Sequence, residues 1–487
     1  MAATLASFAS ILKEFYLGPI QDQLNEETLV CDLFEKASVD WNGRQVIIPC
    51  HVSRNQNVGW VGENNALPGP PVGAVAPGGS QQGYVNLTVT AVFLYGRFQI
   101  SGPAMASAGK GGANSFVGWV DGEMNKLVND IKNNSNRAAV SGGRCIGFAT
   151  VNLQLAPAPG PGPVAVTFDG DLTKAGALVA IGALATGHVR LIRMDTYADQ
   201  SIGGAGGTLD ITAVGPGTIT LDPQVGDTPG VGNFPRDPAG NIIPSAVVLT
   251  DAAAAALAVL PPAGPGLDPD TEPVGIYGNL GLPGDAGVGN AYAGAGWFNT
   301  DRTTVGGAVT GAQTLQCGDG DQPFGTGIPV SNVVSFNVAE ATRINLAVPQ
   351  LQAVLDRMTL ASDSEPDVIL CNPLQRTRLT TVANAQAVLN LNPGAASTRV
   401  ADQGYTGYAF GGIPVKTSRH VDNGCMIFLN TKSWKMTELE SGKFADEDGN
   451  VLSRVGVIDA FEGFYKWYYN LVCTQPNRNG MLCGLSL

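Results

Sequence analysis

The sequence predicts an α+β fold, because stretches with strand periodicity and stretches with helix periodicity occur in separate blocks of the chain. Residues 84–99 begin with strict alternation of apolar and polar side chains, which is typical of a half-buried strand. Residues 114–139 instead place apolar side chains every three or four positions, as on one face of a helix. Residues 407–430 and 457–485 are again rich in β-branched and aromatic residues, which indicates further strands.

The composition predicts an assembly protein. Only 14% of the 487 residues are charged, whereas 44% are hydrophobic, and an ordinary globular protein has roughly 25% charged residues. A free monomer normally needs a charged surface to stay soluble. The low charge is easier to understand if neighbouring copies cover much of the surface.

The charge balance and the cysteines exclude several function classes. A net charge of −13, without a basic stripe, argues against a dedicated nucleic-acid reader. The eight cysteines include no C-x-x-C pair and only three histidines are present, so we expect no metal site. Cysteines within the apolar runs VILCN, CMIFL and NLVCT are expected to be buried, reduced thiols. We see no signal peptide and no run of about 18 apolar residues, so we expect folding in the cytosol and no membrane contact.

The N-terminal segment predicts an intersubunit arm. Apolar residues recur at helical spacing until Gly18-Pro19 ends the pattern; they are Leu5, Phe8, Leu12 and Phe15. A terminal segment of this kind often stays loose until a partner ties it down. The alternative is an ordinary terminal helix docked on its own subunit.

An uncharged excursion follows the strand predicted at residues 43–52. Between Arg54 and Arg97 the only charged residue is Glu63, yet the segment carries apolar side chains that include Trp60, Val61 and Leu67. A strand on each side makes it an extended hairpin, which alone is only marginally stable in water. We therefore expect its tip to rest on another subunit.

The rest of the chain alternates between ordered and Gly/Pro-rich parts. The segments HVRLIRMD and GTLDITAVGPGTITLD predict short strands in a β-rich insertion, and DAAAAALAVL predicts a helix within it. Residues 338–358 predict a helix that Pro349 should kink or divide. A buried strand is expected in SEPDVILCNPLQRTRL.

This order of elements resembles the major capsid proteins of tailed double-stranded-DNA bacteriophages. The segment FGGIPVKTSRHVDNGCMIFLN is similar to a recurring strand–loop–strand passage of that family, PDVILCNPLQRTRL to its strand-to-helix passage, and GWFNTDRT to a stretch of members with a β insertion. The resemblance implies an N-terminal arm (1–42), an extended-loop β-hairpin (43–101), a peripheral domain with a spine helix (102–155), the β-rich insertion (156–335), an axial domain (336–425) and return strands of the peripheral domain (426–487).

The resemblance also implies a function. Such a chain self-assembles as hexamers and pentamers into an icosahedral capsid around a double-stranded DNA genome, with the hairpin of one subunit lying across a neighbour's spine helix. It needs no cofactor, and its partners are further copies, a separate scaffolding protein, a portal and a possible decoration protein, with packaged DNA nearby. The expected location is the virion, after assembly in the host cytoplasm. Because residues 55–96 contain no Lys, the covalent cross-link of some members is not expected.

Two other function classes stay open at this point. An encapsulin-like bacterial nanocompartment has a similar fold, and a secreted β-rich adhesin or glycan-active enzyme would come from a different class. Short motifs do not favour an enzyme. AGKGGANS lacks the Walker A pattern, DEDGN lacks the acidic residue of a calcium loop, and CGDGDQ and the pair His420 and Asp422 read as surface turns. We expect no catalytic residue.

Overall fold

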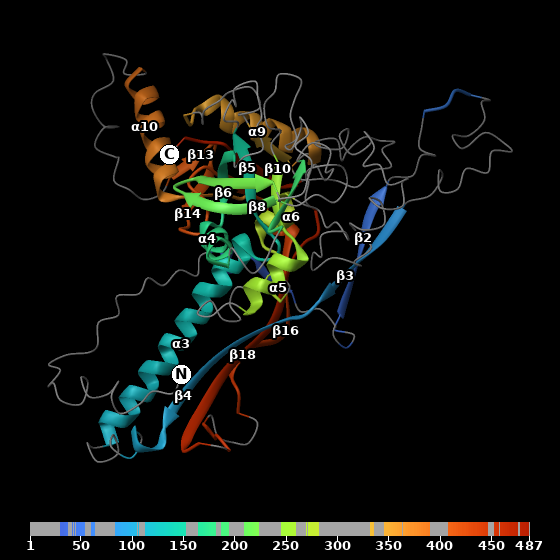
Figure 1. Cartoon of the computed structure of the whole chain (residues 1–487). Coiled ribbons are helices and arrows are strands. Elements are labelled where there is room, and N and C mark those ends of the chain that lie inside the picture. The colour runs from blue at the N-terminus through green and yellow to red at the C-terminus, as the bar shows by residue number, and fades with distance from the viewer. Residues whose placement is uncertain are drawn as a thin grey trace, which may run out of the picture.

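The computed structural model describes the chain in segments that cover most of its predicted strands and helices (Figure 1). The described residues are 30–37, 41, 43, 45–53, 60–63, 83–104, 106, 113–151, 164–181, 187–193, 209–223, 245–259, 269, 271–281, 332–335, 345–362, 364–389, 408–446, 452–456, 458–475 and 478–486. The predicted arm residues Leu5, Phe8, Leu12 and Phe15, and the hairpin residue Leu67, lie outside these ranges.

The first layer is a long helix against a sheet. The helix is α3 (Ala113–Ser141), and the sheet contains β4 (Val92–Ser101), β18 (Ala460–Cys473), β16 (Trp434–Phe444), β17 (Ser453–Arg454) and β1 (Glu35–Ala37). Gly96 of β4 lies directly under α3, where a Cβ atom would come within 2.4 Å of the Ile131 side chain. The absence of a side chain at Gly96 therefore lets the helix lie close to the strand, as Figure 1 shows.

The chain enters this layer through a short anchored segment. The 3-10 turn η1 (Cys31–Leu33) precedes β1, which pairs in parallel with β16. The side chain of Asn136 on α3 accepts hydrogen bonds from the backbone N–H groups of Val30 and Cys31, at 2.8 and 3.2 Å. Residues 30–37 are thus fixed to their own subunit.

The hairpin is a two-stranded ribbon of its own. Strand β2 (Gln45–Ser53) pairs antiparallel with β3 (Gly83–Thr90), and this pair forms a separate sheet. Figure 1 shows the ribbon diverging from the layer of β4 and β18. The sequence suggested one strand over residues 84–99 with a change of phase near Gly96, but the break falls at Ala91. Beyond it, β4 joins β18 instead of the hairpin, so the predicted hairpin range 43–101 is too long.

A closed β-barrel follows α3. Its strands, in order around the barrel, are β10 (Ser245–Leu249), β5 (Cys145–Val151), β6 (Val164–Gly170), β9 (Thr218–Pro223), β8 (Leu209–Gly215) and β7 (Val189–Arg193). The helices α4 (Leu172–Ile181) and α5 (Asp251–Val259) each contribute side chains to its core. The strands predicted in the β-rich insertion and the helix at DAAAAALAVL are confirmed. The predicted boundary at 155/156 cuts the barrel, because β5 is one of its strands.

The remaining strands form a six-stranded sheet. Its order is β11 (Asn332–Ser335), β19 (Gly480–Cys483), β15 (Met426–Leu429), β12 (Val368–Cys371), β14 (Ile413–Thr417) and β13 (Tyr408–Phe410). The helices α9 (Val348–Ser362) and α10 (Pro373–Leu389) accompany this sheet (Figure 1). The predicted division at residue 425 separates strands that pair, because β15 and β19 belong to the sheet of β12 and not to that of β16 and β18.

Pro349 acts differently from the prediction. Helix α9 begins at Val348, and residues 345–347 before it are not helical. Among the described residues, Pro349 therefore lies in the first turn of α9 and neither kinks a helix nor separates two helices. Proline suits the first turn of a helix, where its missing N–H would have had no intrahelical partner. The buried face of α9 is nevertheless as expected, with Leu351, Val354 and Met358 fully buried.

One apolar core joins the layers. It includes Phe148 of β5, Trp434 of β16, and Tyr277 of the short helix α6 (Ile276–Gly281). The rings of Phe148 and Tyr277 meet edge to face at 5.5 Å between centroids. A second core fills the barrel, and a third lies between α9 and the six-stranded sheet.

Candidate functional site: the assembly surfaces

The hairpin tip is exposed where the structure describes it. Trp60 is 105% exposed and Val61 47% exposed. On β2, Ile47 is 53% exposed, whereas Val46 beside it is buried. The ribbon is tied at its base, where the Asn470 side chain donates a hydrogen bond of 2.6 Å to the carbonyl of Thr90. Apolar side chains of this size on a bare ribbon mark a contact surface.

A second apolar surface lies on the face of the sheet that points away from α3. Because side chains alternate along a strand, Phe93 and Tyr95 lie opposite to Gly96 and its neighbour α3. Their rings meet Tyr468 of β18 edge to face, with centroids 5.0 and 5.6 Å apart. The hydroxyl groups of Tyr95 and Tyr468 are 2.9 Å apart, and this hydrogen bond raises the pKa of Tyr468 to about 12. We call Phe93, Tyr95 and Tyr468 the aromatic patch.

Ion pairs frame the aromatic patch. Lys466 lies 6.0 Å from the ring centroid of Tyr468, and its ammonium group is 3.4 Å from Glu440. Lys443 approaches the same carboxylate at 2.8 Å, and its hydrogen bond holds the pKa of Glu440 below its usual value. An apolar centre with a charged rim is the common anatomy of a protein–protein contact.

The opposite face of the sheet is internal to the subunit. The hydroxyl of Ser135 on α3 is 2.9 Å from that of Tyr469 and 3.4 Å from the thiol of Cys31. Tyr469 is buried, and burial raises its pKa well above the usual value. A cavity of about 270 Å³ opens beside these groups, with Trp467 and Lys132 in its lining.

The Cys31 thiol is expected to react slowly and with a steep pH dependence. It lines the cavity, but burial raises its pKa to about 11. At pH 8 only about one thiol in a thousand would be ionised, compared with about a quarter for an ordinary cysteine. The alkylation rate of Cys31 in the folded chain should rise about tenfold per pH unit up to pH 10, as followed by iodoacetamide labelling and peptide mapping. The Cys31→Ser variant identifies the peptide, and a plateau of the rate near pH 9 would contradict the expectation.

The same shift carries a stability consequence. Because the folded state holds the Cys31 proton more tightly than the unfolded state, its contribution is complete below about pH 8.5. It is lost as the pH rises through about 11. The burial of Cys371 raises its pKa to about 12 and acts in the same direction.

The other cysteines and the predicted turns have structural roles where they are described. Burial is confirmed for Cys371, Cys425 and Cys473, and these three side chains are thiols that form no disulfide with the described residues. The backbone N–H of His420 donates to the Ser418 hydroxyl at 3.2 Å, and Asp422 accepts from the N–H of Gly424 at 2.9 Å. Both are turn contacts. CGDGDQ and most of DEDGN lie outside the described residues.

Within the described ranges, no group of three acidic, cysteine or histidine side chains is arranged to hold a metal ion. The described helices include none that is long and apolar enough to cross a membrane.

Sequence reasoning singled out one of the two exposed apolar surfaces, and its role as an intersubunit contact stays a prediction. It singled out Trp60 and Val61, which the structure places together at the exposed tip. It missed the aromatic patch, because the partners Phe93 and Tyr468 are far apart in the chain and meet only through the β4–β18 register. The sequence did carry one signal: Phe93 and Tyr95 are two positions apart in a predicted strand and therefore lie on the same face of it.

Comparison with known proteins shows a partial similarity to one family. Residues 287–486 match the model of the SU10 major capsid protein family. Among solved structures, the capsid asymmetric unit of cyanophage A-1(L) is 10% identical, with 100% of each chain covered and a TM-score of 0.49. A structure from Mycobacterium phage Adephagia is 11% identical, covering 99% of this chain and 98% of that chain, with a TM-score of 0.37. The holo-SrpI encapsulin of Synechococcus elongatus is 15% identical over 29% of this chain and 50% of that chain, with a TM-score of 0.21.

No curated protein sequence matches the chain. The three TM-scores are all below 0.5, and the family match covers less than half of the chain. The helices and strands of the structure confirm the predicted α+β fold class. Over residues 287–486 the chain is similar to the SU10 major capsid protein family, in agreement with the resemblance to major capsid proteins that the sequence predicted.

Proposed function

We propose that copies of this chain assemble, as hexamers and pentamers, into an icosahedral shell that encloses a double-stranded DNA phage genome. The observation that carries this proposal is the exposed ribbon tip, where the side chain of Trp60 is 105% exposed. Heterologous contacts of one surface with another close into rings. Many modest contacts then add up to a stable shell.

We further propose that the ribbon tip docks on the aromatic patch of a neighbouring copy. The sequence-based expectation was a contact with the neighbour's spine helix, α3. The exposed side chains in the described part of α3 are polar, and they include Asn125, Asp130 and Lys132. Tyr95, by contrast, is 56% exposed on the outer face of the sheet, and it offers the tip an apolar surface to cover.

The inner surface of the shell would enclose DNA without binding it tightly. A net charge of −13 supports this, because a wall rich in Lys would bind phosphates strongly and hinder packing. We propose that a separate scaffolding protein, a portal and a possible decoration protein take part, that assembly occurs in the host cytoplasm, and that the chain has no catalytic activity. The division into arm, hairpin, peripheral, inserted and axial parts remains our proposal for the roles of these segments.

Electron microscopy and light scattering of the purified chain test the proposal. We expect closed shells, or capsomer-sized oligomers, when the chain is expressed with or without a scaffolding partner. A monodisperse monomer near 50.2 kDa at high concentration, under both conditions, would contradict it.

The mature shell is expected to lack covalent links between its subunits. Residues 55–96 contain no Lys that could form an isopeptide bond from the hairpin. Particles boiled in denaturant and reductant should therefore run on a gel as one band near 50.2 kDa. A ladder of multimers would show that reactive groups lie elsewhere in the chain.

A further inference from the structure

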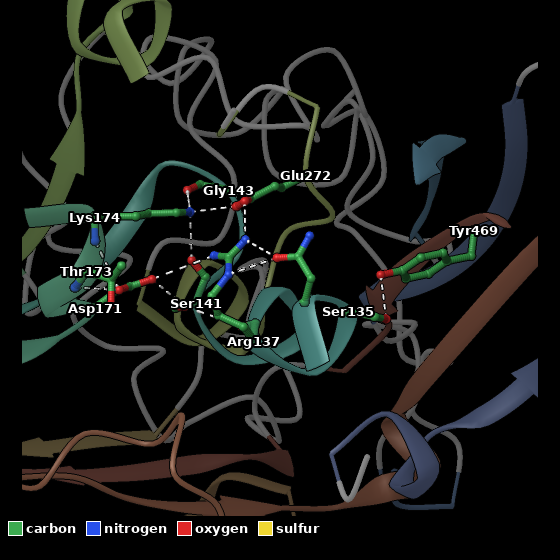
Figure 2. Close-up of polar contacts among 10 residues, drawn as sticks. Ser135, Arg137, Ser141, Gly143, Asp171, Thr173, Lys174, Glu272 and Tyr469 are labelled. Carbon is green, nitrogen blue, oxygen red and sulfur yellow. Dashed lines mark hydrogen bonds and ion pairs between the residues drawn. The ribbon is translucent and has the colours of Figure 1, made fainter. Parts of the chain in front are cut away.

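A buried cluster of charges joins the end of α3 to the start of α4. Its members are Arg137 of α3, Asp171 and Lys174 at the start of α4, and Glu272 from the segment before α6. Their side chains are between 0% and 14% exposed, and they carry two positive and two negative charges. Figure 2 shows these groups converging from three parts of the chain.

Members of the cluster cap both helix ends. Lys174 donates from its ammonium group to the carbonyls of Ser141 and Gly143, both at 3.1 Å, at the C-terminal end of α3. Asp171 accepts from the backbone N–H groups of Thr173 and Lys174, at 2.9 and 3.2 Å, at the N-terminal end of α4. A cation at a helix C-terminus and an anion at a helix N-terminus each satisfy orphan backbone groups and oppose the helix dipole. The Ser141 hydroxyl also donates to Asp171, at 3.0 Å.

Glu272 completes the cluster. One carboxylate oxygen accepts from Lys174 at 2.6 Å and the other from Arg137 at 2.5 Å. Arg137 also donates to Asn134, at 2.9 and 3.1 Å. Burial alone would lower the pKa of Arg137, but the charge and hydrogen bond of Glu272, together with the charge of Asp171, outweigh this effect and raise it.

The backbone around Glu272 is fitted to the end of α3. The N–H of Gly275 donates to the carbonyl of Gly142 at 3.1 Å. A Cβ atom on Gly142 would lie 2.2 Å from the carbonyl oxygen of Pro273, and one on Gly275 would lie 2.7 Å from the carbonyls of Ala138 and Val140. Only glycine allows this approach, so the segment that carries Glu272 is held against α3 by its main chain.

The cluster lies between two apolar cores. Ala175 and Leu178 of α4 belong to the core of the barrel. Ala139 and Val140 of α3 belong to the core shared with Trp434. Phe148 of the barrel strand β5 also belongs to the core shared with α3, so the charge cluster acts together with apolar packing where the barrel meets α3.

We propose that Arg137, Asp171, Lys174 and Glu272 are positioning residues that fix the orientation of the barrel relative to α3. The barrel and α3 then move as one rigid body, so the barrel keeps a fixed orientation in the shell wall. Removing one charge leaves its partner buried without an opposite charge, which is unfavourable. The barrel should then move away from α3 so that water can reach the remaining charge.

Distance measurements within one subunit test this proposal. Spin labels can be introduced as non-natural amino acids at Asn125 of α3 and Thr212 of β8, which are both exposed. In the full-length chain, we expect a narrow distribution of label-to-label distances by pulsed electron paramagnetic resonance. Lys174→Met should at least double its width, and Glu272→Gln should broaden it less.

Two further variants separate positioning from general stability. The double variant Lys174→Met with Glu272→Gln is again balanced in charge, so its distribution should be narrower than that of Lys174→Met alone. Lys36→Met removes the ion pair between the exposed Lys36 and Glu438 and should leave the distribution of distances unchanged. If Lys174→Met does not fold, the width of the distance distribution in Glu272→Gln tests the proposal. Unchanged widths in the folded charge variants, even with lower unfolding midpoints, would overturn the proposal. The readout lies within one subunit, so it is independent of whether shells form.

Discussion

Replacing both Trp60 and Val61 with serine should abolish shell formation and leave the subunit folded. Trp60 is 105% exposed, so its loss should leave the packing of the described residues intact. If the tip is covered by a neighbour, each fully buried side chain of this kind contributes roughly 1.5–3 kcal/mol to the contact. A loss of about 3 kcal/mol weakens each association roughly a hundredfold, and the loss recurs at every subunit.

Circular dichroism and sedimentation of the same variant separate folding from assembly. The expected result is an unchanged spectrum together with particles that are absent or fragile on heating. Ile458→Ser serves as the matched control, because Ile458 is 51% exposed on a different turn. Wild-type particle yield and heat resistance in the tip variant would mean that the tip is a free surface loop and that the docking proposal is wrong.

Local periodicity was enough to predict the elements that depend on neighbours in sequence. The helix α3 spans Ala113–Ser141, compared with the predicted 114–139, because its apolar spacing is a local signal. The strands of the insertion were found for the same reason. The exposed Trp60 was found because a stretch without charge stands out in composition alone.

Contacts between distant segments could not be predicted in this way. Glu272 meets Arg137 across 135 residues and Lys174 across 98, and no spacing rule links them. The break at Ala91 likewise depends on β18, which draws β4 away from the hairpin although both strands look continuous in sequence. Pairing partners are set by tertiary packing, which overrides local propensity.

Replacing Trp434 with alanine is expected to lower the free energy of unfolding more than any of the single substitutions proposed above. Its side chain is fully buried at the first residue of β16, and its ring lies 5.3 Å from that of Phe34 in the anchored N-terminal segment. The indole N–H donates to the side-chain oxygen of Asn479 at 2.9 Å. Truncating a buried tryptophan lowers the free energy of unfolding by about 3–5 kcal/mol, because apolar contacts are lost and a cavity is left behind. The urea midpoint of unfolding should fall accordingly.

The position of Trp434 also predicts where the damage appears first. Phe34 would lose its ring partner, so protease cleavage near residues 30–37 should accelerate before the interior of the barrel is affected. The residues that fill the barrel form a core separate from that of Trp434, although Phe148 of barrel strand β5 shares the core of Trp434. Trp434→Phe is the matched control: it keeps a ring against Phe34 but loses part of the indole volume and the hydrogen bond to Asn479. The side-chain oxygen of Asn479 still accepts from the N–H of Asn430 at 3.0 Å. We expect this variant to lose about 1–3 kcal/mol. Equal loss in the alanine and phenylalanine variants would show that the hydrogen bond, and not the packing, holds the N-terminal segment in place.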